Sequence, residues 1–498
     1  MVNKTGNDVK IPWKDDELSR HECAKFLTSY LTKRFGTISG KKGEDSFVLN
    51  INSSWGFGKS YFLENWKIDL ENSGYPVIYY DAWKNDFSDE PLLGFISELE
   101  SSLGQLFKRS TKARRHAESI VASAKRLLRP ALPLLLAALT KKFTNMTFDE
   151  LMHEVDIADC GVGATDNGAN SSNSSETLSK VIEKAAEQAL KEHKTKQKYI
   201  AEFRVHVSAL VDYIAKSLSS TQLPIFVMVD ELDRCRPTYA IELLENIKHI
   251  FGVPGMCFIV ATDSKQLAAS VKAVYGSEFD AERYLQRFFD QEYVLPDPDY
   301  IKYANFLFST EEFQSGKIIN LIGSGSETSQ NVQLFANMSK VFGLTLRGQN
   351  QCFEMFRAIY LMWNSTERIH LPYLLFLIFL RHARLEAFVS YLSNPLGSEW
   401  ENALDKRVIN SKIFSVMKWV DDSRFQKKSE KISFKELISE YSDLSARDIR
   451  TVMRYVGNVK LIFAMEAGQE LLNCGEFTEE NNPLRKYAIL VRQAGQLI

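Results

Sequence analysis

The sequence predicts an α/β protein with a doubly wound sheet, a long helical insertion within it and a mostly α-helical C-terminal region. Short apolar runs typical of parallel strands buried on both faces occur at residues 47–51, 76–80, 224–229 and 256–261. Segments with helical periodicity alternate with these runs up to about residue 295, as in a doubly wound fold. Beyond Pro298 the periodicity is mostly helical.

The composition is that of a globular protein. Of the 498 residues, 45% are apolar and 25% are charged, and the length suits about three domains. The net charge of -2 excludes a global field that would draw the chain to nucleic acid or membranes. No two of the six cysteines lie within ten residues of each other, which excludes CxxC zinc sites and a small disulfide scaffold. The N-terminal segment has no apolar signal core, so we expect a cytoplasmic protein.

The elements of the N-terminal part follow from their apolar patterns. A polar lead is followed by apolar residues at a helical period, which predicts one helix within residues 1–45. The first strand is followed by a Gly-rich turn and by a helix that begins near Lys59. The second strand is followed by a helix over residues 91–107.

A long insertion separates the second strand from the third. Between residues 108 and 142 the acid Glu118 is outnumbered by basic residues, namely Lys108, Arg109, Lys112, Arg114, Arg115, Lys125, Arg126, Arg129, Lys141 and Lys142. The apolar run at 131–139 is too short to span a bilayer, which takes about 20 helical residues. Residues 160–178 are small and polar and predict a flexible loop, and residues 179–218 predict a helix.

The strongest chemical signal is a phosphate-binding loop, or P-loop. Gly58-Lys59-Ser60 follows the first strand and opens a helix, as the pattern G-x-x-x-x-G-K-[ST] requires. Backbone N–H groups of such a turn hold phosphates, the lysine binds the outer phosphates, and the serine hydroxyl is a Mg²⁺ ligand. Ser53 stands where the pattern has its first glycine. We expect the nucleotide to contact Ser53, Ser54, Trp55, Gly56, Phe57, Gly58, Lys59, Ser60 and Tyr61.

The third strand ends in the carboxylates that a nucleotide hydrolase needs. Asp230 and Glu231 follow the apolar run directly, in the arrangement called Walker B. We expect Asp230 to hold Mg²⁺ and Glu231 to orient or deprotonate the attacking water. With a P-loop upstream, the alternative of an ordinary acidic turn is disfavoured. No N-K-x-D segment specific for guanine follows the strands, so ATP is the expected nucleotide.

Further polar residues are candidates for the same site. Thr262 and Asp263 follow the fourth strand, where a sensor of the γ-phosphate would lie. Arg283, Arg287 and Arg347 are candidate arginine fingers, acting within the chain or from a neighbouring copy. For each arginine taken alone, a surface salt bridge is the competing interpretation.

Together these segments resemble the KAP family of P-loop NTPases, within the larger STAND/AAA-like group. The resemblance covers about residues 10–380, and it is carried by Trp55-Gly56, Tyr80-Asp81-Ala82-Trp83, Asp230-Glu231-Leu232-Asp233-Arg234-Cys235, Phe258–Asp263, Arg283–Arg287, Leu344–Arg347 and Asp16–Arg20. It implies an ATPase with a long insertion between the P-loop and Walker B. Many members carry transmembrane helices there, whereas the apolar run here is too short. Bacterial members are often implicated in phage exclusion or defence.

The resemblance and the motifs together suggest five parts. We expect residues 1–104 and 219–298 to form the two portions of the NTPase core and 105–218 to form the basic helical insertion. We expect residues 299–390 to form a helical lid or sensor domain and 391–498 a helical C-terminal domain of unknown role.

Three interpretations are open for the basic stretch at 108–142. It lies on an anionic membrane surface at the inner membrane face, it contacts nucleic acid phosphates, or it is a helical hairpin with a solvated basic face. Pro130 and Pro133 argue against one continuous amphipathic helix. A homo-oligomer and a partner or effector protein are also expected.

We therefore predict a Mg²⁺-dependent ATPase that acts as a conformational switch, with antiphage defence as its biological role. The alternative is an ATP-binding scaffold with little turnover that recruits a membrane or a partner protein.

Overall fold

The computed structural model describes most of the chain. It describes residues 12–14, 16–38, 46–108, 110–127, 174–217, 221–314, 316–320, 322–323, 325–363, 368–419, 427–446, 451–452, 454, 461–473 and 482–496. The chain divides into two compact units. The first contains His21–Ser54 and Lys59–Leu295, and the second contains Trp13–Arg20, Trp55–Gly58 and Pro296–Ile498.

A five-stranded parallel sheet forms the centre of the first unit, which confirms the predicted fold class. Its strand order is β2-β3-β4-β1-β5. The strands are β1 (Phe47–Asn52), β2 (Val77–Asp81), β3 (Ile225–Asp230), β4 (Met256–Thr262) and β5 (Gln291–Val294). The first four coincide with the predicted apolar runs. The edge strand β5 was not predicted, because its four residues are exposed or half-buried and carry no apolar run.

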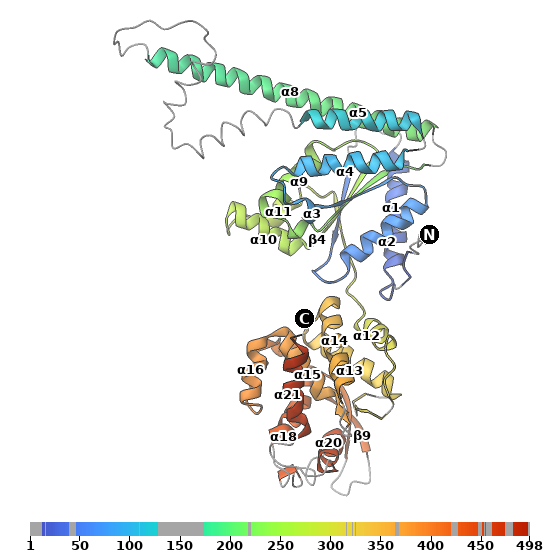
Figure 1. The fold of residues 1–498 in the computed structure, drawn as a ribbon, viewed down its shortest axis with the longest axis vertical. Helices are drawn as coiled ribbons and strands as arrows, with labels where there is room; N and C mark the ends of the chain where they lie inside the picture. Colours follow the sequence, from blue (N-terminus) through green and yellow to red (C-terminus); the bar gives the residue numbers. More distant parts are fainter. Residues whose placement is uncertain are drawn as a thin grey trace, which may run out of the picture. The chain divides into compact units, whose positions relative to one another are not determined.

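Helices cover both faces of this sheet (Figure 1). On one face lie α1 (Arg20–Ile38) and α2 (Lys59–Asn72), joined by a hydrogen bond of 2.8 Å from Trp66 Nε1 to Thr28 Oγ1. The helices of the opposite face share one hydrophobic core with alternate residues of the strands, such as Val227 and Val229. These helices are α4 (Pro91–Leu106), α9 (Pro237–His249), α10 (Ser264–Tyr275) and α11 (Ala281–Leu285), with the short α3 (Ala82–Asn85) after β2.

Two helices of the insertion lie side by side (Figure 1). They are α5 (Thr111–Leu127) and α8 (Ser174–Ser217), and small or apolar residues of α5, such as Ala117 and Ile120, lie in the same core as Phe203 of α8. α8 begins at Ser174, so residues 174–178 correct the predicted loop. Its first residues, Ser-Ser-Glu, suit the first turn of a helix. The rest of that loop and the apolar run at 131–139 lie outside the described residues.

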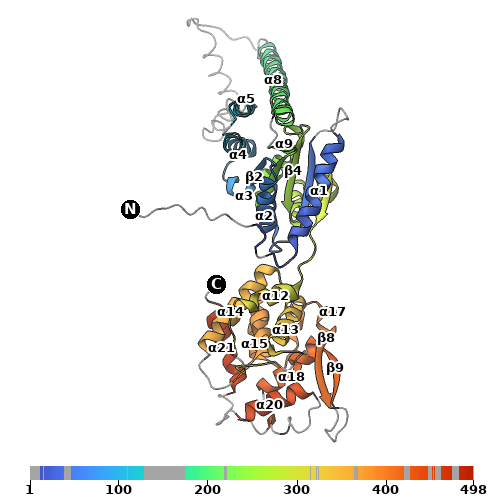
Figure 2. The ribbon, with the colours of Figure 1, turned by 90° about the vertical axis from the view of Figure 1, so that its right-hand side faces the viewer.

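The second unit is mostly helical, as predicted. Its helices are α12 (Tyr300–Ser309), α13 (Glu327–Val341), α14 (Leu346–Met362), α15 (Leu371–Ala383), α16 (Leu385–Ser393), η3 (Glu399–Ala403), α17 (Lys406–Ile409), α18 (Phe434–Ala446), α20 (Ile462–Asn473) and α21 (Pro483–Ala494). Short strands β6 (Ile318–Ile319) and β7 (Ile369–His370) pair in parallel. The antiparallel hairpin of β8 (Lys412–Trp419) and β9 (Lys427–Ser433) packs against α18 and α20 (Figure 2). The sequence did not reveal it, because most of β9 is polar and exposed.

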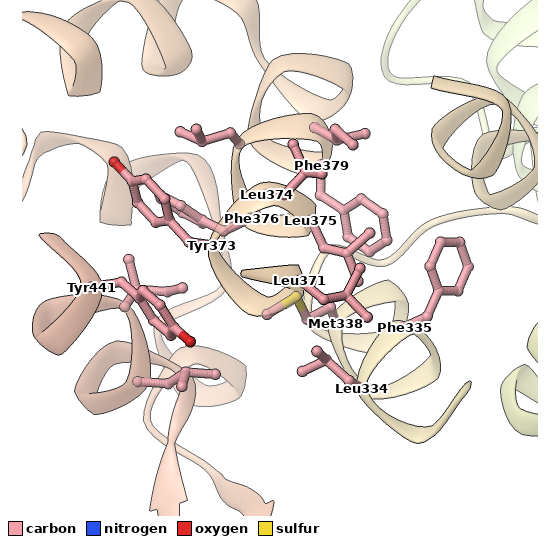
Figure 3. Close-up of a cluster of buried hydrophobic side chains, with 14 of the residues drawn as sticks. Leu334, Phe335, Met338, Leu371, Tyr373, Leu374, Leu375, Phe376, Phe379 and Tyr441 are labelled. Carbon is pink, nitrogen blue, oxygen red and sulfur yellow. The ribbon is translucent and has the colours of Figure 1, made fainter. Parts of the chain in front are cut away.

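The apolar helix α15 is the centre of the second unit (Figure 3). Residues 371–380 are all buried, and the ring of Phe376 packs edge-on against Tyr391 at 4.9 Å. The run at 373–380 is therefore a core helix, as expected. One hydrophobic cluster extends from Ala304 to Ala494, and the boundary predicted at residue 390 stays a prediction, as do the other domain boundaries. Within the described residues, no helix combines the length and apolar character needed to cross a membrane.

Candidate nucleotide-binding site

The turn between β1 and α2 has the backbone of a phosphate-binding loop. Gly56 and Gly58 have φ angles of 79° and 86°, a region that side chains with a Cβ rarely adopt. The helix α2 begins at Lys59, so its first N–H groups have no partner within the helix. These groups and the positive end of the helix dipole make such a turn suitable for an anion.

Ser53 fits this turn because its backbone N–H and carbonyl groups, and not its side chain, make the hydrogen bonds there. Its N–H donates to the carbonyl of Thr262 at 3.1 Å, and its own carbonyl accepts a hydrogen bond of 2.7 Å from Lys59 Nζ. Among the described residues the non-glycine positions with positive φ are Trp13, Ser19 and Glu231, so Ser53 is not among them. The chain therefore has no conformational need for glycine at this point.

Lys59 and Ser60 each contact the segment that follows β3. The side chain of Lys59 is 9% exposed, and its Nζ lies 3.4 Å from Asp233 Oδ2. The hydroxyl of Ser60 donates to Glu231 Oε1 at 3.1 Å. The structure thus brings the P-loop and the predicted Walker B segment together, 171 positions apart in sequence.

The strand β3 is buried along its whole length and delivers Asp230 and Glu231 to its carboxyl end. Asp230 Oδ2 accepts a hydrogen bond of 2.7 Å from the Tyr79 hydroxyl, and Oδ1 accepts one of 2.8 Å from the N–H of Glu231. Glu231 adopts φ 59°, which turns the chain sharply after the strand. Its Oε2 lies 2.5 Å from Nε of Arg234. Hydrogen bonds therefore hold the carboxylate of Asp230, and a hydrogen bond and an ion pair hold that of Glu231.

Burial raises the pKa of both carboxyl groups. For Asp230 the hydrogen bonds from the Tyr79 hydroxyl and the Glu231 N–H oppose this effect, as does the nearby Ser60 hydroxyl. For Glu231 the charge of Asp230 raises the pKa further, while the Arg234 guanidinium lowers it. A buried carboxyl with a raised pKa beside a P-loop is typical of a proton-handling group.

Thr262 and Asp263 lie at the end of β4, next to the P-loop. The hydroxyl of Thr262 donates to Asn50 Oδ1 at 2.8 Å, and the side chains of Thr262 and Asn50 are buried. Asp263 caps α10, accepting hydrogen bonds from the N–H groups of Lys265 and Gln266. Both side chains are thus used within the fold, and their contact with a γ-phosphate stays a prediction.

The three candidate arginines are exposed. Arg283 lies in α11 and Arg287 lies just beyond it. Within the described part of the chain, no hydrogen bond or ion pair joins either guanidinium to Glu231, which pairs with Arg234. Arg347 is exposed in the first turn of α14, in the second unit. Of the remaining P-loop residues, Trp55 and Tyr61 are large and exposed, Ser54 is exposed, and Phe57 is half-buried.

The structure adds three residues that the sequence interpretation did not assign to the site. Tyr79 binds Asp230, Asp233 pairs with Lys59, and Arg234 pairs with Glu231. Within the second unit, Arg20 is buried, and its guanidinium donates to the carbonyls of Pro296 at 2.8 Å and Phe57 at 3.4 Å. Asp233 and Arg234 stand within the Walker B segment, so proximity in sequence was the available signal. The contact of Tyr79 depends on the pairing of β2 with β3.

The basic stretch is partly neutralised where it is described. Lys125 pairs with Glu100 at 2.7 Å, and Arg126 pairs with Glu202 at 3.2 Å. Arg114 pairs with Glu118 at 3.4 Å on the same helix. These pairs fit the interpretation of a solvated basic face best, while membrane and nucleic acid contact stay predictions.

A family comparison places the chain among P-loop proteins. The model described as "KAP family P-loop domain" matches residues 29–318, which is more than half of the chain. The chain therefore belongs to the KAP family of P-loop NTPases, and the predicted resemblance is confirmed. A comparison with curated proteins gave no match.

Solved structures provide more distant similarities. The structure of C. elegans PCH-2 is 12% identical with a TM-score of 0.29, covering 79% of this chain and 77% of that one. The Aeropyrum pernix ORC2 protein, in ADPNP-ADP complexes, is 12% identical with a TM-score of 0.31, covering 99% of this chain and 97% of that one.

Proposed function

We propose that the protein is a Mg²⁺-dependent ATP hydrolase that works as a conformational switch. The observation that carries this proposal is the 3.1 Å contact of the Ser60 hydroxyl with Glu231. It places the helix that follows a P-loop against the carboxylate that follows a buried strand. This is the pair of elements that phosphoryl transfer to water needs.

The residues present fit a nucleotide with Mg²⁺. The positive φ angles of Gly56 and Gly58 let backbone N–H groups approach phosphates. Lys59 would bind the outer phosphates, and Ser60 and Asp230 would hold the metal. Bound Mg²⁺ neutralises charge on the phosphates. Among the described residues no cluster of three or more His, Cys, Asp or Glu could hold a metal ion alone, and a nucleotide-bound Mg²⁺ takes only one or two protein carboxylates.

Glu231 would orient and deprotonate the attacking water. Its raised pKa, caused first by burial and then by the Asp230 charge, makes it a better proton acceptor than an exposed glutamate. The Arg234 guanidinium opposes both effects and lowers the pKa of Glu231. We propose that Arg347 couples the second unit to the nucleotide state, and that a homo-oligomer supplies Arg283 or Arg287 to a neighbouring site.

The first test compares wild type with Lys59→Ala and Glu231→Gln. We expect wild type to bind Mg²⁺-ATP and release phosphate, Lys59→Ala to lose binding, and Glu231→Gln to bind without turnover. The measurements are calorimetric binding and phosphate release. Absence of nucleotide binding in wild type would remove the P-loop assignment and the mechanism with it.

A second candidate function is an ATP-binding scaffold with little turnover. It is favoured by one observation: both carboxylate oxygens of Glu231 are engaged, one by Ser60 and one by Arg234. These two contacts restrain the carboxylate, and a scaffold needs no movement of it away from them. Equal and negligible phosphate release by wild type and Glu231→Gln, with ATP bound tightly by both, would support the scaffold.

We propose antiphage defence or phage exclusion in the bacterial cytoplasm as the biological role. The support is the family, whose bacterial members are often implicated in it. The proposal includes peripheral membrane contact or a partner protein for residues 108–142. The test is the plating efficiency of phages on cells that express wild type or Lys59→Ala. Equal plating on both would contradict a nucleotide-dependent defence role.

A further inference from the structure

Asp233 is a buried carboxylate beside the P-loop lysine, and the proposed hydrolysis gives it no role. It lies in the short 3-10 helix η2 (Leu232–Arg234), and its side chain is 1% exposed. Its Oδ2 lies 3.4 Å from Lys59 Nζ and accepts a hydrogen bond of 2.6 Å from the N–H of Asp263. One carboxylate therefore joins the P-loop lysine to the end of β4.

We infer that Asp233 is a positioning residue, the counter-ion of Lys59 in the nucleotide-free site, which phosphate oxygens replace as the partner of Lys59 when nucleotide binds. The inference rests on the proposed function, because it takes a phosphate as the ligand of Lys59. It adds that the free site holds its own anion, so nucleotide binding exchanges one anionic partner of Lys59 for another.

The burial of Lys59 is the physical reason for a counter-ion. An ammonium group removed from water without an opposite charge is costly. The carbonyl of Ser53 accepts a hydrogen bond from Nζ at 2.7 Å, but it is neutral and compensates no charge. Asp230 is engaged with Tyr79, and Glu231 is engaged with Ser60 and Arg234. Asp233 is the carboxylate that forms the ion pair with Lys59.

The ion pair of Asp233 with Lys59 is expected to weaken nucleotide binding. An ion pair that stabilises the free site more than the bound site weakens binding, because the ligand must compete with it. Asp233→Asn keeps the size of the side chain and an oxygen for the Asp263 N–H, but it removes the charge. We therefore expect this variant to be less stable without nucleotide and to bind nucleotide more tightly, by about tenfold.

The binding experiment uses the full chain with Mg²⁺ and a non-hydrolysable ATP analogue. Calorimetry gives Kd, and thermal unfolding with and without the analogue gives the ligand-induced shift in Tm. We expect Asp233→Asn to show a lower Kd and a larger shift than wild type. A purely structural role in holding the Asp263 N–H would lower Tm equally with and without the analogue, and an unchanged or higher Kd overturns the inference.

A mutant cycle with Lys59→Met tests the ion pair without nucleotide. In wild type we expect Asp233→Asn to lower Tm, since it leaves the ammonium unpaired. In the Lys59→Met background the same change removes an unpaired carboxylate, so Tm is expected to stay or rise. Additive effects overturn the inference. This cycle stands even if wild type binds no nucleotide, in which case the proposed function fails separately.

Asp290→Asn is the control for loss of a less buried ion pair, because the side chain of Asp290 is 33% exposed. Asp290 lies in the same unit, accepts the N–H of Val48 at 2.8 Å and pairs with Lys248 at 2.9 Å, as Asp233 does with Asp263 and Lys59. It is expected to leave Kd unchanged. If Asp233→Asn alone does not fold, the double variant with Lys59→Met is expected to fold. Failure of the double variant, when Lys59→Met alone folds, overturns the inference.

Discussion

The hydroxyl group of Tyr79 donates a hydrogen bond of 2.7 Å to Oδ2 of Asp230. The two residues belong to β2 and β3, which pair in parallel from Val77 and Phe226 to Asp81 and Asp230. Since Oδ1 accepts the Glu231 N–H, both oxygens of this buried carboxylate have a donor. The donors favour the ionised form that a metal needs, against the effect of burial on the pKa.

Tyr79→Phe is expected to weaken the apparent affinity for Mg²⁺ by about threefold, because loss of the donor raises the pKa of Asp230 further. The loss should be largest at low pH, where a carboxyl group of raised pKa binds a proton, and should shrink as pH rises. The free energy of unfolding should fall by about 1 kcal/mol. Mg²⁺ titration of nucleotide binding at two pH values measures the effect. Tyr75→Phe is the control, and an equal loss in both variants contradicts the assigned role.

Arg234→Gln is expected to shift the acid limb of the pH profile of phosphate release to higher pH. The Arg234 guanidinium lowers the pKa of Glu231, so its removal leaves burial and the Asp230 charge less opposed. Glu231 then becomes protonated at higher pH, and activity is lost there first. The measurement is kcat across pH 5 to 8. Arg236→Gln is the control, because Arg236 pairs with Asp86 and Asp89. An unshifted limb would show that Glu231 does not determine it.

Ser53→Gly and Gly58→Ala are expected to differ in their effect on nucleotide binding. Ser53 contributes backbone atoms and has no positive φ, so adding glycine should change Kd by less than about threefold. Gly58 has φ 86°, so a Cβ there strains the turn by about 1 kcal/mol or more. In the Gly58→Ala variant the Kd for nucleotide should rise about tenfold, or the turn should rearrange. Calorimetry distinguishes the two, and equal effects would contradict this account of the turn.

The second unit is expected to lose stability as pH falls below 6.5. His370 is buried, and burial together with the Arg368 charge lowers its pKa from 6.5 to about 4. The unfolded chain therefore binds a proton below pH 6.5 that the folded unit excludes until about pH 4. The expected loss is about 2 kcal/mol between pH 7 and pH 5.

Hydrogen exchange of the α15 amides at both pH values measures this loss. His370→Gln should remove most of the pH dependence, because glutamine binds no proton in this range. His249→Gln changes an exposed histidine of the first unit and should leave the pH dependence of the second unit unchanged. Persistence of the full pH dependence in His370→Gln would assign it to other groups.

Periodicity and motif spacing were sufficient to predict most of the fold and the contiguous segments of the candidate site. The buried strands β1 to β4 are recognisable in the sequence as apolar runs, because strands covered on both faces do not alternate polar and apolar residues. The edge strand β5 and the hairpin of β8 and β9 carry no such pattern, since water covers much of them. The start of α8 at Ser174 was missed because serine-rich segments suit both loops and helix starts.

The sequence by itself determined the family and the candidate residues: Lys59 and Ser60 open a helix after one strand, Asp230 ends another strand and Glu231 follows it. Local order is enough for these, because a P-loop and a strand end are contiguous segments. Only the tertiary structure decided the partners. Parallel pairing of β2 with β3 brings Tyr79 to Asp230, and the packing of α2 against β3 brings Asp233 to Lys59. These contacts join residues 151 and 174 positions apart, and no local pattern records a contact of that range.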